Sequence, residues 1–98
     1  MVTRADNVDS VLRPCPSVRS STSVDGLVLL DTAGGLILSA NPVGARIWRL
    51  IEQGLADADI ARQVAAEYAV AIERAEADVD AFLESLIARG LVLRDRIA

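Results

Sequence analysis

The sequence predicts an α+β domain in which a three-stranded antiparallel sheet comes before three helices, in the order β-β-β-α-α-α. Two patterns indicate this fold class. Residues 18–40 consist of short apolar or β-tolerant runs separated by turn residues, which is typical of hairpin strands. Residues 42–89 instead repeat apolar side chains every three or four positions, as amphipathic helices do. A length of 98 residues fits one domain with a modest core.

Three short segments are expected to form the strands. The first lies within "SVRSSTSV" and is followed by Asp25-Gly26, a turn signal of the kind found between hairpin strands. The second is the apolar run Leu27 to Leu30, which is too short for a helix. The turn "DTAGG" separates it from the third strand, "LILSA", at residues 36–40. Tight links between consecutive strands predict an antiparallel meander.

The first helix is expected to begin directly after the third strand. Asn41 can cap it, because its side chain can accept a hydrogen bond from an amide of the first turn. Pro42 suits the first helical position, where its missing N–H costs nothing. Apolar residues between positions 43 and 51 share one face, and Gly54 ends the helix.

Two further helices follow. Residues 57–68 repeat an apolar side chain every four positions, and residues 73–89 form the longest amphipathic pattern, which Gly90 ends. The tail "LVLRDRIA" is expected to pack back on the domain before it frays. The apolar face of the last helix consists of Ala75, Val79, Phe82, Leu83, Leu86 and Ile87.

The N-terminal residues do not show either pattern. Residues 1–16 mix charged and small polar side chains with two prolines, so we expect a flexible arm there and the folded domain at residues 17–94. The sequence has neither a signal-peptide h-region nor the ~20 consecutive apolar residues of a membrane span, and a cytoplasmic location is expected. Cys15 is the single cysteine, so an internal disulfide is impossible.

The composition argues against catalysis and against a bound metal or cofactor. The chain has no histidine, the commonest general base and metal ligand, and its one cysteine cannot form a zinc site. "AGGL" lies in a predicted hairpin and not before a helix, so we interpret it as a turn rather than a phosphate-binding loop. The carboxylates of Glu73, Glu76, Asp80 and Glu84 lie at spacings of three and four and fit a solvated helix face. We therefore expect no enzyme activity, no catalytic residue, no metal and no cofactor.

A small sheet beside three helices is also the arrangement of winged helix-turn-helix proteins, so DNA binding is an alternative. The net charge of −4 disfavours it, because a surface that binds nucleic acid is normally basic. The last helix, a candidate recognition helix, carries mostly acidic side chains, which would repel phosphates. A winged-helix DNA-binding regulator is therefore the alternative function from a different class of protein.

The third strand indicates peptide binding. At the edge of a meander its backbone groups can pair with another strand, and "LILSA" lacks the charges that usually protect such edges. The last helix could instead cover this edge. The abrupt Asn41-Pro42 connection favours an open groove, because it fixes where the strand stops, and the groove would bind a peptide by strand addition. The expected peptide-binding residues are Leu36, Ile37, Leu38, Ser39 and Ala40 on the strand and Val79, Phe82, Leu83 and Leu86 on the helix.

Four segments together resemble a known family: "VLLD", "NPVGARIW", "EYAV" and "ERAEADVDAFLESLIARGLV". In this order and spacing they are similar to the PqqD-like proteins, which are RiPP precursor peptide recognition elements. The similarity covers residues 18–93, nearly the whole predicted domain. It implies a winged-helix-like domain that binds the leader peptides of ribosomally made natural products. It also implies that the leader pairs with residues 36–40 and that the domain itself performs no catalysis.

The resemblance implies partners as well. The chain resembles the discrete recognition proteins of lasso peptide clusters, whose partners are a leader peptidase and an ATP-dependent cyclase. The leaders of that group offer a tyrosine and a proline as anchors. The alternative within the family is pyrroloquinoline quinone biosynthesis, where the partner is a radical-SAM enzyme.

The sequence departs from the family pattern where two helices begin. Ala56 stands where the family often has a threonine or serine cap, so Asp57 is expected to cap the second helix instead. Ala71-Ile72 stands where the family often has Asp-Pro, which predicts a poorly capped third helix.

Overall fold

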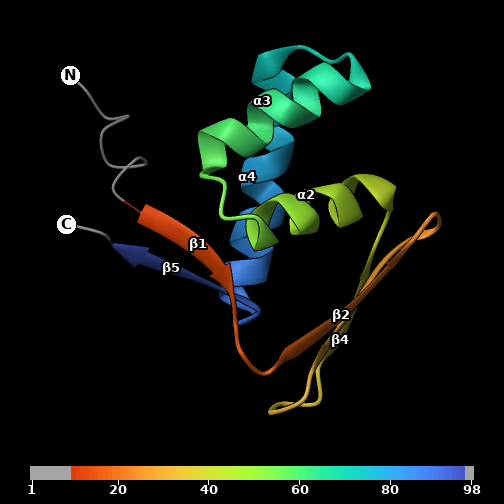
Figure 1. Cartoon of the computed structure of the whole chain (residues 1–98), viewed down its shortest axis with the longest axis vertical. Helices are drawn as coiled ribbons and strands as arrows, with labels where there is room; N and C mark the ends of the chain where they lie inside the picture. The colour runs from red at the N-terminus through yellow and green to blue at the C-terminus, as the bar shows by residue number, and fades with distance from the viewer. Residues whose placement is uncertain (1–9, 97–98) are drawn as a thin grey trace.

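Residues 10–96 are described in this computed structural model, and they form two small antiparallel sheets and three helices (Figure 1). The predicted order of three strands followed by three helices is confirmed, with one further strand at each end. The elements in chain order are β1 (Ser10–Pro14), β2 (Val18–Ser23), β3 (Gly26–Asp31), β4 (Ile37–Ala40), α2 (Pro42–Glu52), α3 (Asp57–Tyr68), α4 (Ile72–Ala88) and β5 (Val92–Arg96).

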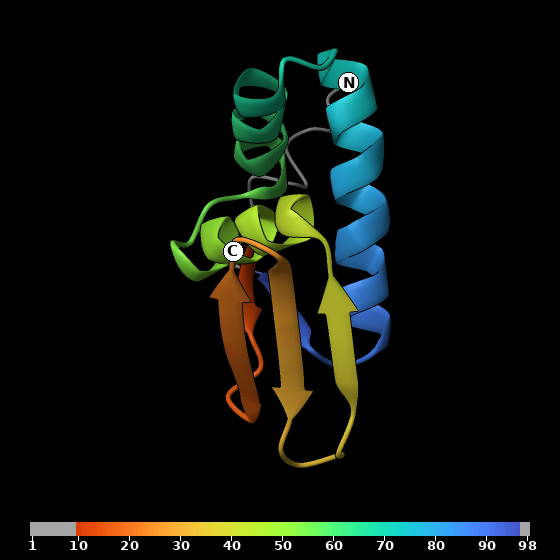
Figure 2. The same cartoon turned by 90° about the vertical axis from the view of Figure 1, so that its right-hand side faces the viewer.

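The larger sheet is the predicted meander. Its strand order is β2-β3-β4, so β3 is central and β4 is an edge strand (Figure 2). The register pairs Leu29 of β3 with Leu38 of β4. Side chains alternate between the two faces, as in any pleated strand. Leu27 and Leu29 are buried toward the helices, whereas Val28 and Leu30 on the outer face are 47% and 39% exposed.

The three predicted helices are confirmed. Helix α2 packs against both β3 and α3, so it joins the sheet to the pair formed by α3 and α4. Trp48 and Leu50 of α2 are almost completely buried in the core where these elements meet. Within residues 10–96, no helix has the length and apolar character needed to cross a lipid bilayer.

The starts of α3 and α4 lack side-chain caps. Ala56 and Ala71 are the N-cap residues, and neither provides a hydrogen bond from its side chain. The expectation that Asp57 caps α3 is wrong, because Asp57 lies inside the helix and its carboxylate pairs with Arg94 of β5 at 3.0 Å. This ion pair connects the start of α3 to the smaller sheet.

The smaller sheet, β1 paired with β5, is a feature that the sequence analysis missed. Residues 10–14 were expected to belong to an arm, but they pair antiparallel with Val92–Arg96, with Leu12 opposite Arg94. Leu12 and Val92 are each 1% exposed and belong to the core. Arg13 also forms an ion pair with Asp95 across the strands. The first nine residues of the predicted arm lie outside the described residues.

The prediction failed because the partner of β1 is distant in the sequence. The segment "SVLRP" is short, ends in a proline and carries a charge, so it shows no strand pattern of its own. Its place is determined by pairing with a segment about eighty positions later, which no local periodicity reveals. The sequence did suggest that the C-terminal tail packs back on the domain, which β5 confirms.

Leu12→Ala is expected to lower the free energy of unfolding by about 2–5 kcal/mol, because it would leave a cavity in the core. Urea denaturation of the whole chain measures this. Arg13→Ala is the control, since its side chain is half exposed and should change stability by less than ~1 kcal/mol. Equal stability of the two variants would show that β1 does not stabilise the core.

Candidate functional site

The edge of β4 has a defined set of outward-facing backbone groups. The amide of Asp31 donates to the carbonyl of Leu36 at 2.8 Å, so Leu36 directs its backbone groups toward β3. In an antiparallel ladder this direction alternates along the strand. Leu38 and Ala40 therefore also face β3, while the N–H and C=O groups of Ile37 and Ser39 point away from the sheet.

A second observation supports this register. Gly26 has φ of +137°, and a Cβ placed on it would collide with the carbonyl oxygen of Ala40. That carbonyl therefore points into the sheet, as the alternation requires. It follows that Ile37 and Ser39 are the two β4 residues with which an added strand would form hydrogen bonds.

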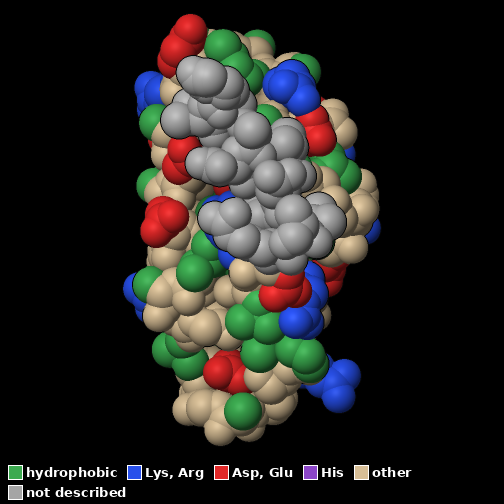
Figure 3. Space-filling model, turned by 90° about the vertical axis from the view of Figure 1, so that its left-hand side faces the viewer, with side chains coloured by type: hydrophobic (Ala, Val, Ile, Leu, Met, Phe, Trp, Pro, Cys, Tyr) green, Lys and Arg blue, Asp and Glu red, His purple; other side chains and the backbone are tan. Residues whose placement is uncertain are grey.

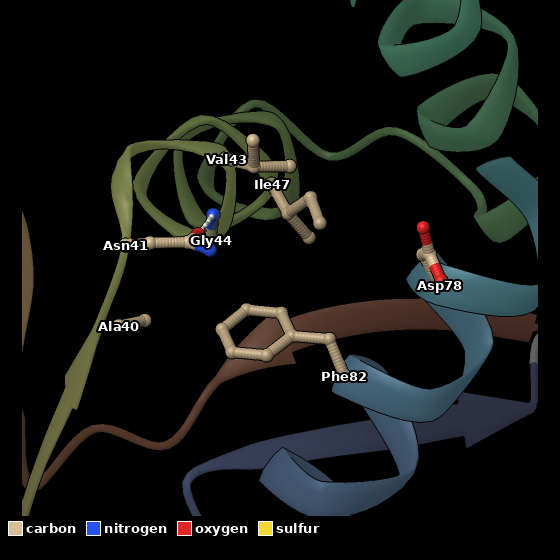
Figure 4. Close-up of a pocket in the computed structure, with 7 residues that line it drawn as sticks. All are labelled: Ala40, Asn41, Val43, Gly44, Ile47, Asp78 and Phe82. Atoms are coloured by element: carbon tan, nitrogen blue, oxygen red, sulfur yellow. Dashed lines mark hydrogen bonds between the residues drawn. The ribbon is translucent and has the colours of Figure 1, made fainter. Parts of the chain in front are cut away.

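A cavity lies where β4 ends, between the N-terminal turn of α2 and the side of α4 (Figure 4). Its volume is about 380 Å³. Phe82 points from α4 toward Ala40 and Gly44, and Asp78 lies one turn earlier on the same helix. The lining residues are Ala40, Asn41, Val43, Gly44, Ile47, Asp78 and Phe82.

The connection between β4 and α2 shapes one side of this cavity. The Asn41 side chain accepts a hydrogen bond from the amide of Gly44 at 2.9 Å, and Pro42 is the first residue of the helix. The predicted cap is therefore confirmed. Because no loop intervenes, the first turn of α2 lies directly beside the end of β4.

Gly44 is required there by close packing. A Cβ on this residue would lie 2.7 Å from the Ala40 Cβ and 3.2 Å from Cζ of Phe82. The first distance is shorter than any normal contact between carbon atoms. The missing side chain thus allows the strand, the helix and the Phe82 ring to meet closely.

The turn before β4 is held by Asp31. Its carboxylate accepts hydrogen bonds from the Ser17 hydroxyl at 2.8 Å and from the Ala33 amide at 3.1 Å. The Ser17 bond, and secondarily the Ala33 bond, lowers the pKa of Asp31. These contacts connect the β3–β4 turn to the start of β2 and so fix where β4 begins.

The structure brings some of the predicted site residues together. Leu36, Leu38 and Ala40 are half-buried against the core, whereas Ile37 is 66% exposed and Ser39 is exposed on the outer face. On α4, Phe82 alone of the predicted residues lines the cavity.

The assignment of the other three helix residues to the groove is corrected. Val79, Leu83 and Leu86 have no exposed surface and belong to the core. The apolar residues of α4 span both the side that packs in the core and the neighbouring side that carries Phe82. Helical periodicity alone did not distinguish these two sides. These three side chains hold α4 in place and do not line the cavity.

Sequence analysis also missed several lining residues. Val43 and Ile47 were expected on the apolar face of the first helix, and Asp78 was counted only among the acidic side chains of the last helix, but all three line the cavity. Their i, i+4 spacing places Val43 and Ile47 on one stripe, but only the packing of α2 against α4 shows that this stripe borders a cavity.

The arrangement suits ligand binding more than catalysis. It offers backbone hydrogen-bonding groups along a strand edge and a mostly apolar cavity at the end of that edge. Among residues 10–96, no group of three or more His, Cys, Asp or Glu side chains is placed to hold a metal ion.

The family model described as coenzyme PQQ synthesis protein D (PqqD) matches residues 26–92, which is more than half of the chain. The chain belongs to the PqqD family. The matched range includes β3, β4 and all three helices, and therefore every residue that lines the cavity.

Two solved structures are similar to this member of the PqqD family. One is TbiB1 in complex with the TbiA(beta) leader peptide, with 32% identity and a TM-score of 0.76 over 82% of this chain and 93% of that chain. The other is lasso peptide synthetase B1 complexed with the leader peptide, with 32% identity and a TM-score of 0.76 over 84% and 96% of the two chains. Among curated protein sequences, no match is found.

Gly44→Ala is expected to destabilise the fold by about 1–3 kcal/mol through overpacking, partly offset by the ~1 kcal/mol that alanine gains over glycine in a helix. Thermal or urea unfolding measures the net change. Because the added methyl would press on Phe82, a double-mutant cycle with Phe82→Ala should show a non-additive relief of strain. Strictly additive effects would contradict the contact.

Proposed function

We propose that this chain binds the leader region of a ribosomally synthesised precursor peptide by strand addition to β4, beside α4, and takes no part in catalysis. The observation that carries the proposal is the uncharged outer edge of β4, which pairs with no other strand among residues 10–96 and leads into the cavity lined by Phe82. Two relatives of similar fold, each solved with a leader peptide, support it.

The geometry suggests how a peptide would be held. A guest strand would exchange backbone hydrogen bonds with Ile37 and Ser39 (Figure 2). Its alternate side chains would face the same side as Ala40, toward Phe82. Each backbone hydrogen bond would contribute ~1 kcal/mol and each apolar anchor ~2 kcal/mol to the binding free energy. The cost of ordering the peptide reduces this sum, so we expect micromolar affinity.

The lasso peptide pathway is the favoured setting, because one of the two solved relatives is a lasso peptide synthetase B1. In that setting the chain would deliver the precursor to a leader peptidase and an ATP-dependent cyclase in the cytoplasm. The alternative is a PqqD-type role in pyrroloquinoline quinone biosynthesis, since the family description is that of coenzyme PQQ synthesis. Copurification with a radical-SAM enzyme, and not with a peptidase, would favour this alternative.

A DNA-binding regulator is the less favoured candidate. Acidic residues predominate on the exposed side of α4, and the net charge of the chain is −4. The face in Figure 3 mixes Arg side chains with acidic ones instead of presenting a basic stripe. Phosphate contacts require such a stripe.

Ser39→Pro is expected to weaken leader binding by about tenfold or more, because proline removes an outward N–H that would donate to the guest strand. Fluorescence polarisation with labelled TbiA(beta) leader peptide measures this. The N–H of Ser39 does not bond to β3, so the sheet should survive the change. Ser39→Ala, which keeps the N–H, should bind within about twofold of the wild type. Unchanged binding by a folded Ser39→Pro protein would rule out strand addition at this edge.

Phe82→Ala is expected to weaken binding of the same peptide by about tenfold or more, because it removes the aromatic wall of the cavity. Phe82→Leu keeps an apolar wall and should lose less. Circular dichroism and unfolding curves would establish that both variants are folded. Equal affinity of Phe82→Ala and the wild type would place the peptide elsewhere.

A further inference from the structure

Asp78 gives the cavity a property that the proposed mode of binding does not use. Among the described residues that line the cavity, it alone carries a charge. The rest of the lining is apolar or, in the case of Asn41, already engaged as the cap of α2. A carboxylate at one end of an otherwise mostly apolar cavity favours a ligand group that is apolar along its length and positively charged at its end.

The contacts that Asp78 makes within the chain leave it available. Arg74, one helical turn earlier, pairs with it at 3.4 Å. The side chains of Arg74 and Asp78 are 75% and 62% exposed. A pair this long and this exposed is weak, so a second cation could share or replace Arg74 at little cost.

The acid and the ring occupy one stripe of α4. Asp78 and Phe82 are four residues apart, and such residues lie above one another on a helix surface. Val43 and Ile47 form the facing wall on α2 (Figure 4). A long side chain entering beside Ala40 would therefore pass Phe82 and these aliphatic groups before its end reaches Asp78.

The end of β4 determines which residue of a bound peptide would place its side chain in the cavity. Ser39 is the last β4 residue whose backbone groups point outward, and the cavity begins at Ala40. The guest residue beside Ala40 would have its side chain on the same face of the extended sheet, which is the cavity side. Lysine and arginine have the required form, since they bury an aliphatic stem while the charged head stays near water.

We propose that Asp78 is a specificity-determining residue that selects leader peptides with lysine or arginine at the position beside Ala40. This inference rests on the proposed function. The cavity would then prefer a cationic peptide side chain over a neutral side chain of the same length, and it would reject an acidic side chain. The surrounding charge of α4, which includes Glu73 and Glu84, acts in the same direction.

The test is a positional scan of the TbiA(beta) leader peptide in which each residue in turn is replaced by lysine, norleucine or glutamate. Norleucine has an aliphatic stem without the charge. For the wild-type protein, one position should favour lysine over norleucine by about fivefold and norleucine over glutamate. Asp78→Asn should abolish the lysine preference at that position, and Asp78→Lys should reverse it toward glutamate.

Two controls separate this role from general charge and from stability. Glu84→Gln removes the same charge from α4 at a residue outside the cavity, and it should leave the lysine preference unchanged. Arg74→Ala removes the competing cation and should increase the preference. A purely structural role for Asp78 would weaken binding of all three peptides equally.

The outcomes distinguish the inference from the proposed function. If the peptides bind but lysine and norleucine are equivalent, or Asp78→Asn leaves their ratio unchanged, this inference is overturned while strand addition stands. If no peptide in the series binds, the proposed function fails and the inference fails with it. If the preference is present but Glu84→Gln abolishes it as well, the selection comes from net charge and not from Asp78.

Discussion

The junction of β4 and α2 is the constraint on which the rest of the site depends. The Asn41 side chain bonds to the Gly44 amide, and Pro42 begins the helix, so the strand becomes a helix without a loop. A flexible connection would let α2 move relative to the sheet. Here α2 is held at the end of β4, where it closes one side of the cavity and leaves the strand edge open. Edge and cavity therefore keep a fixed relation to each other.

Small residues at this junction create the space that larger ones would fill. Gly44 and Ala40 let the Phe82 ring approach both the strand and the helix. On the same helix, Val79 and Leu83 are fully buried and anchor α4 in the core. The cavity is thus bordered by a well-supported helix and not by a mobile loop. An open, uncharged edge strand is normally an aggregation hazard, and its retention beside such a cavity is understandable if the edge has a partner.

Sequence patterns predicted the elements well where the information was local. The meander followed from the turns around Asp25-Gly26 and "DTAGG", and α2 from its cap and proline. They failed at β1, because Leu12 is buried by pairing with a segment near the other end of the chain. The sequence patterns also predicted the edge strand and Phe82, but not Asp78. Helical periodicity shows which residues share a face of one helix, but it does not show which of these faces stays exposed after the helices pack together.

In the proposed mode of peptide binding, affinity and selectivity would have separate physical sources. The outward groups of Ile37 and Ser39 would bind the backbone of any extended peptide, so they contribute binding with little sequence information. In that mode of binding, discrimination would come from the side chains that the guest places in the cavity, where Phe82 and Asp78 lie one turn apart on α4. Such a division would let a small domain, with few aromatic residues and a modest core, bind an extended peptide and still distinguish it from other extended chains.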